Sequence, residues 1–349
     1  MAEKQFKTAI LGLDQCGLLL AEAVSQLQHF ELIAVADKDL GLCQRIAEKL
    51  ECEYCDDYRL LITQHDLDCL LVCEGLHSCE EYIRMAMRKK THIFKQNPMA
   101  RNFEEACEFV KLSDKEGVGY FTGVGLRYNQ GFMKLRDLIS SGQLDRINQI
   151  NVQCFTSGKK HPGWQSDWKL SGGGVLLYDC YEIIDFLNEN FSLPENIYCL
   201  YTNKANDRKQ RQYLTDEYVI LSLRYSDGLI GSIISSNSCG TAGIHIQVYA
   251  SNKTLKTTKN SLILCDNNGT ILDSYTYKDT DLEIAKQALT DFSDFLVSSD
   301  KKRVLLRTRK NLENMAFIEA SYLSGRTGTP EDASKILEMS GYENETDSQ

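Results

Sequence analysis

TAILGLDQCG, residues Thr8–Gly17, joins a short apolar run to a glycine turn and the start of a helical pattern. Gly12 and Gly17 occupy the first and third glycine positions of a G-x-G-x-x-G turn. In such a turn, glycines permit a tight bend, close approach of the backbone to a pyrophosphate and close packing of helix on strand. The stretch therefore predicts a strand–turn–helix unit that binds the phosphates of a dinucleotide.

The second glycine of the pattern is replaced by Asp14. A carboxylate beside the pyrophosphate would repel it and would weaken the favourable field at the helix N-terminus. The same side chain could instead turn away from the ligand and cap the helix, because aspartate is a strong N-cap residue. The sequence leaves both interpretations open.

A second acidic residue indicates which dinucleotide is bound. Asp37 ends the predicted strand 31–36 and follows Gly17 by about 20 residues, a spacing at which a carboxylate binds the adenosine ribose hydroxyls. This favours NAD over NADP, although Lys38 leaves some room for a 2′-phosphate. The alternative is an aspartate that only caps the next helix. The predicted cofactor contacts are Gly12, Asp14, Gln15, Cys16, Gly17, Asp37, Lys38, Cys73 and Gln96.

The rest of the chain follows two patterns. Up to residue 125, apolar strands alternate with helical segments, which implies right-handed β-α-β crossovers and a parallel sheet. Beyond it, alternating segments separated by turns predict a large, mostly antiparallel sheet with solvent or a partner on one face. We therefore expect an α/β protein with a doubly wound Rossmann domain over 1–125, a second α/β domain over 126–335 and a flexible tail over 336–349.

Composition argues against several functional classes. The 39 basic and 49 acidic residues give a net charge of −10, and no basic run is interleaved with aromatic residues, which argues against nucleic-acid binding. A polar N-terminus and the absence of long apolar runs predict neither a signal peptide nor a membrane span. The 13 irregularly spaced cysteines indicate free thiols in a reducing, cytoplasmic compartment. Cys52 and Cys55 lack a second ligand pair, so no metal site is expected.

Several stretches resemble the Gfo/Idh/MocA oxidoreductases, the family of glucose–fructose oxidoreductase and inositol dehydrogenase. Besides the opening turn, the resembling stretches are Leu32–Asp37, His92–Ala100, Arg127–Ile147, Trp164–Asp185, with its triple glycine Gly172–Gly174, and Ala320–Thr329. The resemblance implies a Rossmann domain followed by an α/β domain with a mostly antiparallel sheet. It also implies NAD(P), a sugar or cyclitol oxidised at a hydroxyl carbon, and a homodimer or homotetramer joined through the open face of that sheet.

The positions that carry catalysis in the family depart from its pattern. The family usually has Glu-Lys-Pro after the fifth strand, whereas Gln96, Asn97 and Pro98 stand here. The aspartate and histidine that usually follow the triple glycine are replaced by Tyr178 and Glu182. Oxidation of an alcohol by hydride transfer needs a base for the hydroxyl proton. Glu182 can serve as that base and Tyr178 as an acid, whereas Asn97 can offer only neutral hydrogen bonds.

Three further residues are candidates for substrate contact. Arg127 can bind an anionic group or hold an inter-domain ion pair, and the ion pair is favoured. Trp164 lies in a polar loop where an aromatic ring suits the face of a sugar, or packs on the core as a lid. Asp185 matches a further family aspartate.

Two hypotheses follow from these residues. The first is an NAD(P)-dependent oxidoreductase acting on a carbohydrate- or cyclitol-like hydroxyl or ketone. The second is a catalytically silent relative that binds a dinucleotide or a sugar as a regulatory protein. The retained two-domain scaffold slightly favours the enzyme, while the changed catalytic positions favour the silent relative.

Overall fold

The computed structural model describes residues 5–156, 163–205, 212–297 and 301–341. They form two compact units. The first unit comprises Met1–Ala100, Glu105–Gly125 and Thr280–Asn311. The second comprises Arg101–Glu104, Leu126–Asp279 and Leu312–Gln349.

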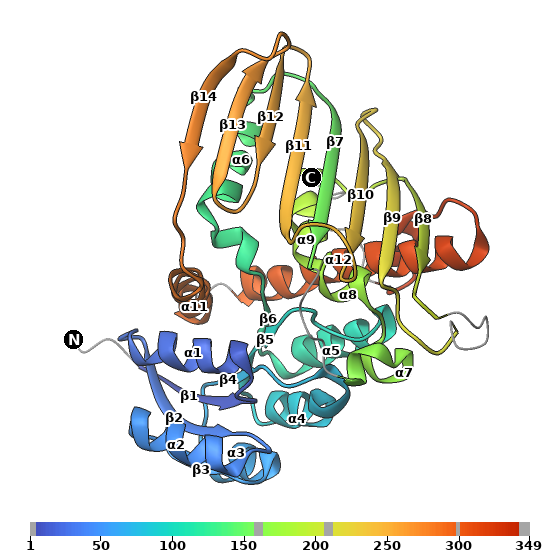
Figure 1. The fold of residues 1–349 in the computed structure, drawn as a ribbon. Coiled ribbons are helices and arrows are strands. Elements are labelled where there is room, and N and C mark those ends of the chain that lie inside the picture. The colour runs from blue at the N-terminus through green and yellow to red at the C-terminus, as the bar shows by residue number, and fades with distance from the viewer. Residues whose placement is uncertain (1–4, 157–162, 206–211, 298–300, 342–349) are drawn as a thin grey trace. The chain divides into compact units, whose positions relative to one another are not determined.

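The first unit is built on a six-stranded parallel sheet in the order β3-β2-β1-β4-β5-β6 (Figure 1). This order confirms the predicted doubly wound Rossmann topology, in which the strand order reverses between β1 and β4 while all strands stay parallel. Its strands are β1 (Phe6–Leu11), β2 (Phe30–Ala36), β3 (Glu53–Cys55), β4 (Cys69–Val72), β5 (His92–Gln96) and β6 (Tyr120–Gly123). Its first five helices are α1 (Gln15–Ser25), α2 (Leu40–Leu50), α3 (Tyr58–Gln64), α4 (Leu76–Arg88) and α5 (Phe103–Glu116).

Helix α11 (Asp281–Val297) belongs to the first unit, although the sequence placed this segment in the second domain. Its Phe292 ring lies 5.5 Å from the ring of Phe94 and 5.4 Å from that of Phe121. Phe295 lies 5.8 Å from Phe121. These rings complete the aromatic core beside the sheet, and burial of large aromatic area provides the reason for the late return of the chain.

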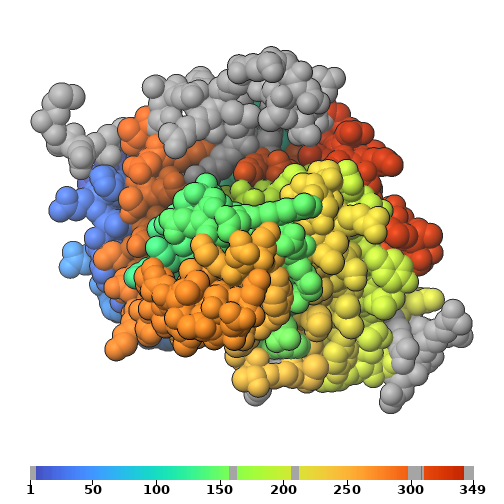
Figure 2. Space-filling view, turned by 90° about the horizontal axis from the view of Figure 1, so that it is seen from above, coloured from blue at the N-terminus to red at the C-terminus, as the bar shows by residue number. Residues whose placement is uncertain are grey.

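The second unit contains an eight-stranded sheet in the order β14-β13-β12-β11-β7-β10-β9-β8. In Figure 2 this strand order is seen as a change of colour across the sheet, from the orange of β14 through the green of β7 to the yellow of β9 and β8. Strands β7 and β10 pair in parallel and all other neighbours pair antiparallel, so the predicted mostly antiparallel sheet is confirmed. The strands are β7 (Ile147–Phe155), β8 (Asn196–Thr202), β9 (Tyr218–Arg224), β10 (Ile230–Ser236), β11 (Gly243–Ala250), β12 (Lys253–Thr257), β13 (Ser261–Asp266) and β14 (Ile271–Thr276).

Helices cover one face of this sheet. Helix α6 (Gln130–Ser140) packs on β12 and β13, and α8 (Val175–Tyr178) packs on β9 and β10. The unit also contains α7 (Trp168–Ser171), α9 (Tyr181–Asn190) and α13 (Ala333–Glu338). A long helix, α12 (Lys301–Thr327), starts in the first unit and ends in the second.

Several short elements were not predicted. Strands β3 and β12 and helices α3 and α9 have no counterpart among the predicted elements, because short segments offer too few residues for a clear period. Helix α13 covers the start of the range 336–349 in which we expected a flexible tail. The end of that range, residues 342–349, lies outside the described residues.

Candidate functional site

The glycine turn after β1 closes against the end of β4. Gly12 has a φ of +91°, and a Cβ on it would lie 2.7 Å from the amide nitrogen of Glu74. A Cβ on Gly17 would lie 2.0 Å from the carbonyl oxygen of Gly12. Any larger side chain would force the turn open, so both positions require glycine for the tight turn and the close helix–strand packing that a pyrophosphate-binding turn needs.

Asp14 is the N-cap of α1. Its carboxylate accepts a hydrogen bond of 2.9 Å from the amide of Gly17. Burial raises the pKa of the Asp14 carboxyl, and the amides of Gly17 and Cys16, together with the charge of Lys95, oppose this rise only in part. The structure thus shows the capping geometry, one of the two interpretations that the sequence left open.

Asp37 is held in a fixed orientation at the end of β2. Its two carboxylate oxygens accept hydrogen bonds from the amides of Leu13, at 2.6 Å, and Asp39, at 2.9 Å. The next residue, Lys38, pairs with Glu74 at 3.4 Å. A carboxylate oriented in this way at the end of the second strand suits the two hydroxyls of a ribose.

The end of β5 carries a buried cation that the sequence did not single out as part of the cofactor site. The Lys95 side chain is 3% exposed, and its ammonium donates a hydrogen bond of 2.8 Å to the carbonyl of Gln96. The side-chain amide of Gln96 donates to the Asn97 side chain at 3.3 Å. A hydrogen bond with Cys16, together with burial, raises the pKa of the Cys73 thiol. Gln15, the first residue of α1, is exposed.

Arg127 and Asp185 form a buried, bidentate ion pair. The Arg127 guanidinium donates to the two carboxylate oxygens of Asp185 at 2.7 and 2.6 Å and lies 3.3 Å from Glu189. Burial opposes the charge of Arg127, but Asp185 and Glu189 outweigh it and raise its pKa. Asn314 donates a further hydrogen bond of 2.7 Å to Asp185. All four residues belong to the second unit, so this is not the inter-domain pair that we expected.

The triple glycine packs against its own unit. A Cβ on Gly172 would lie 2.0 Å from the carbonyl oxygen of Arg101, and a Cβ on Gly174 would lie 2.1 Å from that of Asp216. The Asp216 carboxylate accepts hydrogen bonds of 2.8 Å from the amides of Gly174 and Leu176. Close approach of backbone to backbone therefore accounts for glycine at two of the three positions.

The predicted catalytic residues lie in different units. Asn97 follows β5 in the first unit, whereas Tyr178 and Glu182 lie at the end of α8 and in the first turn of α9 in the second. The Tyr178 hydroxyl donates to the carbonyl of Ser171 at 2.9 Å, and its ring meets the Trp164 ring edge-on at 6.0 Å. The phenolic proton of Tyr178 is thus directed at a backbone carbonyl.

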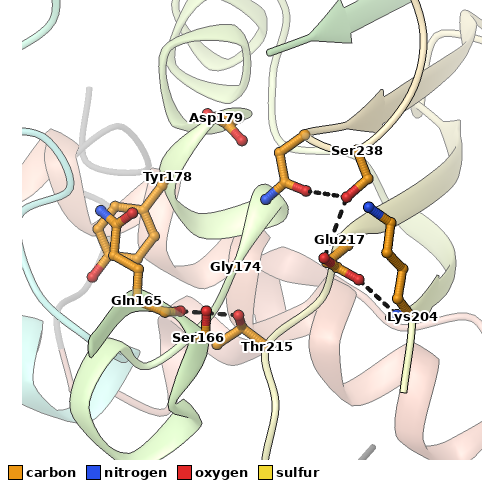
Figure 3. Close-up of a pocket in the computed structure, with 10 residues that line it drawn as sticks. Gln165, Ser166, Gly174, Tyr178, Asp179, Lys204, Thr215, Glu217 and Ser238 are labelled. Carbon is orange, nitrogen blue, oxygen red and sulfur yellow. Dashed lines mark hydrogen bonds between the residues drawn. The ribbon is translucent and has the colours of Figure 1, made fainter. Parts of the chain in front are cut away.

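A polar cavity of about 390 Å³ lies beside Tyr178 within the second unit (Figure 3). Glu217 accepts hydrogen bonds from the Ser238 hydroxyl at 3.2 Å and from the amide of Lys204 at 2.6 Å. Asp179 accepts a hydrogen bond of 2.9 Å from Thr156. The lining residues are Gln165, Ser166, Gly174, Tyr178, Asp179, Lys204, Thr215, Glu217, Asn237 and Ser238.

Sequence reasoning missed most of this cavity. Five of the lining residues, from Gln165 to Asp179, lie in the stretch Trp164–Asp185 that resembles the family, and that stretch was the available signal. Glu217, Lys204 and Asn237 come from separate strands and loops, so only the sheet brings them together.

All 13 cysteines are free, as predicted. Among the described residues, no group of three or more His, Cys, Asp or Glu side chains is arranged to hold a metal ion. The helices of the described chain include none that is long and apolar enough to cross a membrane.

Family models match most of the chain. Residues 6–124 match an oxidoreductase family model with an NAD-binding Rossmann fold, and residues 132–256 match the GFO/IDH/MocA C-terminal domain. The chain belongs to the GFO/IDH/MocA oxidoreductase family. Its first unit is the NAD-binding Rossmann domain of that family, and the predicted family and cofactor are confirmed.

Several relatives of this chain are enzymes that act on sugars or cyclitols. An uncharacterized oxidoreductase, YrbE of Bacillus subtilis, is 25% identical over 50% of this chain and 50% of its own length. Myo-inositol 2-dehydrogenase of Thermotoga maritima is 23% identical over 66% of this chain and 68% of its own. The 2,7-anhydro-N-acetylneuraminate hydratase of Escherichia coli is 22% identical over 64% of this chain and 60% of its own. The match to the first of these spans half of the relative's length.

Solved structures share the fold over almost the whole chain. A levoglucosan dehydrogenase in complex with NADH and levoglucosan superposes with a TM-score of 0.82 at 12% identity, covering 94% of this chain and 99% of that one. The WlbA dehydrogenase of Bordetella pertussis, in complex with NADH and UDP-GlcNAcA, gives a TM-score of 0.77 at 17% identity, covering 95% and 98%. At these identities the likeness shows the fold.

Proposed function

We propose that this protein is an NAD-dependent oxidoreductase that transfers a hydride to or from a hydroxyl carbon or ketone of a carbohydrate- or cyclitol-like substrate. The observation that carries the proposal is the polar cavity beside Tyr178, with the carboxylates of Asp179 and Glu217 in its wall. Its volume, about 390 Å³, is within the range of small-molecule sites. Carboxylates accept hydrogen bonds from hydroxyls, so this lining suits a polyhydroxylated ligand.

The proposed chemistry divides the work between cofactor and protein. In oxidation, the substrate carbon gives a hydride to the nicotinamide ring, and the hydroxyl proton passes to a base. We assign the base to Glu182, a carboxylate in the first turn of α9 that lines a small hollow with Arg127 and Asp185 rather than the cavity itself. Its charge, like that of Asp179, contributes to the raised pKa of Cys154 after the larger effect of burial. Asp179 and Glu217 are assigned to binding substrate hydroxyls.

The test has two stages. Nicotinamide fluorescence is followed while NADH is added to the full chain, and NAD reduction is then measured with a panel of sugars and cyclitols. Glu182→Gln should abolish turnover and retain NADH binding, because the carboxylate base is lost while the cofactor turn is untouched. Asp179→Asn should mainly raise KM.

A matched control is Glu195→Gln, which removes an exposed carboxylate of the same unit outside the cavity. Its turnover should equal that of the unaltered protein. Unchanged turnover in Glu182→Gln would remove Glu182 from the mechanism. If neither NADH nor NADPH binds at millimolar concentration, the proposal that this protein is an oxidoreductase is overturned.

The second candidate function is a silent, ligand-binding relative. The observation that favours it is the state of the predicted catalytic positions: Asn97 replaces the family lysine, and the Tyr178 hydroxyl donates to a backbone carbonyl. NADH binding with no turnover of any panel substrate would support this candidate.

We further infer a homodimer or homotetramer joined through the open face of the eight-stranded sheet. Leu200, Ile220 and Ile234 lie in register across β8, β9 and β10 and are 56%, 50% and 38% exposed. A row of apolar side chains on one sheet face is typical of a covered surface. Ile220→Glu should yield monomers in light scattering, and an unaltered mass would contradict this assembly.

A further inference from the structure

The Glu74 carboxylate accepts hydrogen bonds from three side chains in the first unit, Tyr58, Ser78 and Lys38, and we call these four residues the Glu74 cluster. One oxygen accepts from the Tyr58 hydroxyl at 2.8 Å, and the other accepts from the Ser78 hydroxyl at 2.8 Å and from the Lys38 ammonium at 3.4 Å. Burial raises the pKa of Glu74, but the hydrogen bonds from Tyr58 and Ser78 and the charge of Lys38 outweigh this and lower it. Glu74 is therefore a firmly held anion whose side chain is only 16% exposed.

This cluster lies at the dinucleotide-binding edge of the sheet. Lys38 follows the end of β2, Glu74 follows the end of β4, and β1 lies between these strands. The Lys38–Glu74 pair thus crosses the end of β1. At this point the strand order reverses, and α/β proteins bind their ligands at such a switch point. The amide of Glu74 also abuts Gly12 of the phosphate-binding turn.

A cavity of about 600 Å³ adjoins the pair and is lined by Lys38, Tyr58 and Ser78, together with the charged side chains of Asp56, Asp57 and Arg59. Arg59 is itself paired with Glu81 at 2.8 Å. Three of the residues of the Glu74 cluster therefore face open space at the adenosine end of the site. Asp37, the predicted ribose ligand, directly precedes Lys38. A phosphate on the ribose 2′-oxygen would consequently come close to Lys38, whose ammonium is paired with Glu74.

We propose that Glu74 is a specificity-determining residue that makes this site select NAD over NADP. A cation beside the ribose is what accommodates a 2′-phosphate in NADP-binding sites. Here Glu74 neutralises Lys38, so the pair offers no net positive charge to a phosphate dianion. The inference rests on the cofactor binding of the proposed function at the same site.

The test compares the affinities of the full chain for NADH and NADPH by nicotinamide fluorescence, in the unaltered protein and in Glu74→Gln. The unaltered protein should prefer NADH. Removal of one negative charge, with release of Lys38, should tighten NADPH binding by about tenfold, while NADH affinity changes by less than about threefold. Glu74→Ala, which places no new donor against Tyr58 and Ser78, provides a second charge-removing variant should the glutamine disturb folding.

Two controls make the test specific. Glu80→Gln removes a carboxylate from the same helix, α4, where it pairs with Arg84 rather than lining the cavity, and it should leave both affinities unchanged. Adding Lys38→Met to Glu74→Gln should cancel the gain for NADPH, because the released cation is then absent.

The outcomes separate this inference from the proposed function. If the unaltered protein binds NADH and the ratio of the two affinities stays the same in both Glu74 variants, Glu74 does not set specificity and the inference is overturned alone. If the unaltered protein binds neither nucleotide, the proposed function fails and the inference fails with it.

Discussion

Removal of the buried Arg127 charge should strongly destabilise the second unit. In Arg127→Met, Asp185 loses two charge-assisted hydrogen bonds of 2.6 and 2.7 Å but stays in a site where it is 1% exposed. Each such bond contributes roughly 1.5–3 kcal/mol, and breaking a buried ion pair from one side costs about 3–5 kcal/mol. The Asn314 hydrogen bond remains and cannot neutralise the carboxylate. We therefore expect the free energy of unfolding to fall by about 3–5 kcal/mol.

The chain provides a probe for this unit. Its two tryptophans, Trp164 and Trp168, both belong to the second unit, so urea unfolding followed by tryptophan fluorescence reports on that unit. Loss of the carboxylate charge in Arg127→Met/Asp185→Asn should restore most of the stability.

The matched control is Arg326→Met, which breaks the more exposed Arg326–Glu319 pair of 2.9 Å in the same unit. It should cost less than about 1 kcal/mol, as exposed ion pairs do. If Arg127→Met costs no more than Arg326→Met, the reasoning about the buried pair is refuted.

Three further predictions concern the cofactor turn and the triple-glycine loop. Because burial raises the pKa of the Asp14 carboxyl above its ordinary value of 3.8, the folded state binds this proton at a higher pH than the unfolded state does. The free energy of unfolding should therefore increase as pH falls through the raised pKa, and this contribution should be absent at neutral pH. Asp14→Asn, which keeps an oxygen for the Gly17 amide, should remove this part of the pH dependence in denaturation curves; an unchanged profile would contradict it. Lys95→Met should weaken NADH binding about tenfold without lowering Tm, because a buried cation near the turn is lost while the volume is kept; equal affinity would exclude Lys95 from the site. Tyr322→Phe removes a 2.8 Å hydrogen bond to buried Asp216 and should cost about 1–3 kcal/mol in urea unfolding, and a cost near zero would show that this bond is not needed.

Local sequence was sufficient for most of the fold. Alternation of apolar strands with helices predicted the parallel sheet, and Asp14, Gly12 and Gly17 predicted the start of α1 within the turn. These features depend on neighbours a few residues apart, where steric and hydrogen-bonding preferences act directly. The return of α11 to the first unit was missed, because the contact of Phe292 with Phe94 joins residues far apart in the chain.

The candidate site divides in the same way. The sequence by itself determined the dinucleotide turn and the position of Asp37, since both follow from spacing along one strand–turn–helix–strand unit. Only the tertiary structure decided that Arg127 and Asp185 neutralise each other, that Glu217 shares a cavity with Asp179, and that Glu74 pairs with Lys38. Electrostatic and cavity-forming contacts depend on distances in space between separate elements, and the pattern of residues along the chain carries no record of those distances.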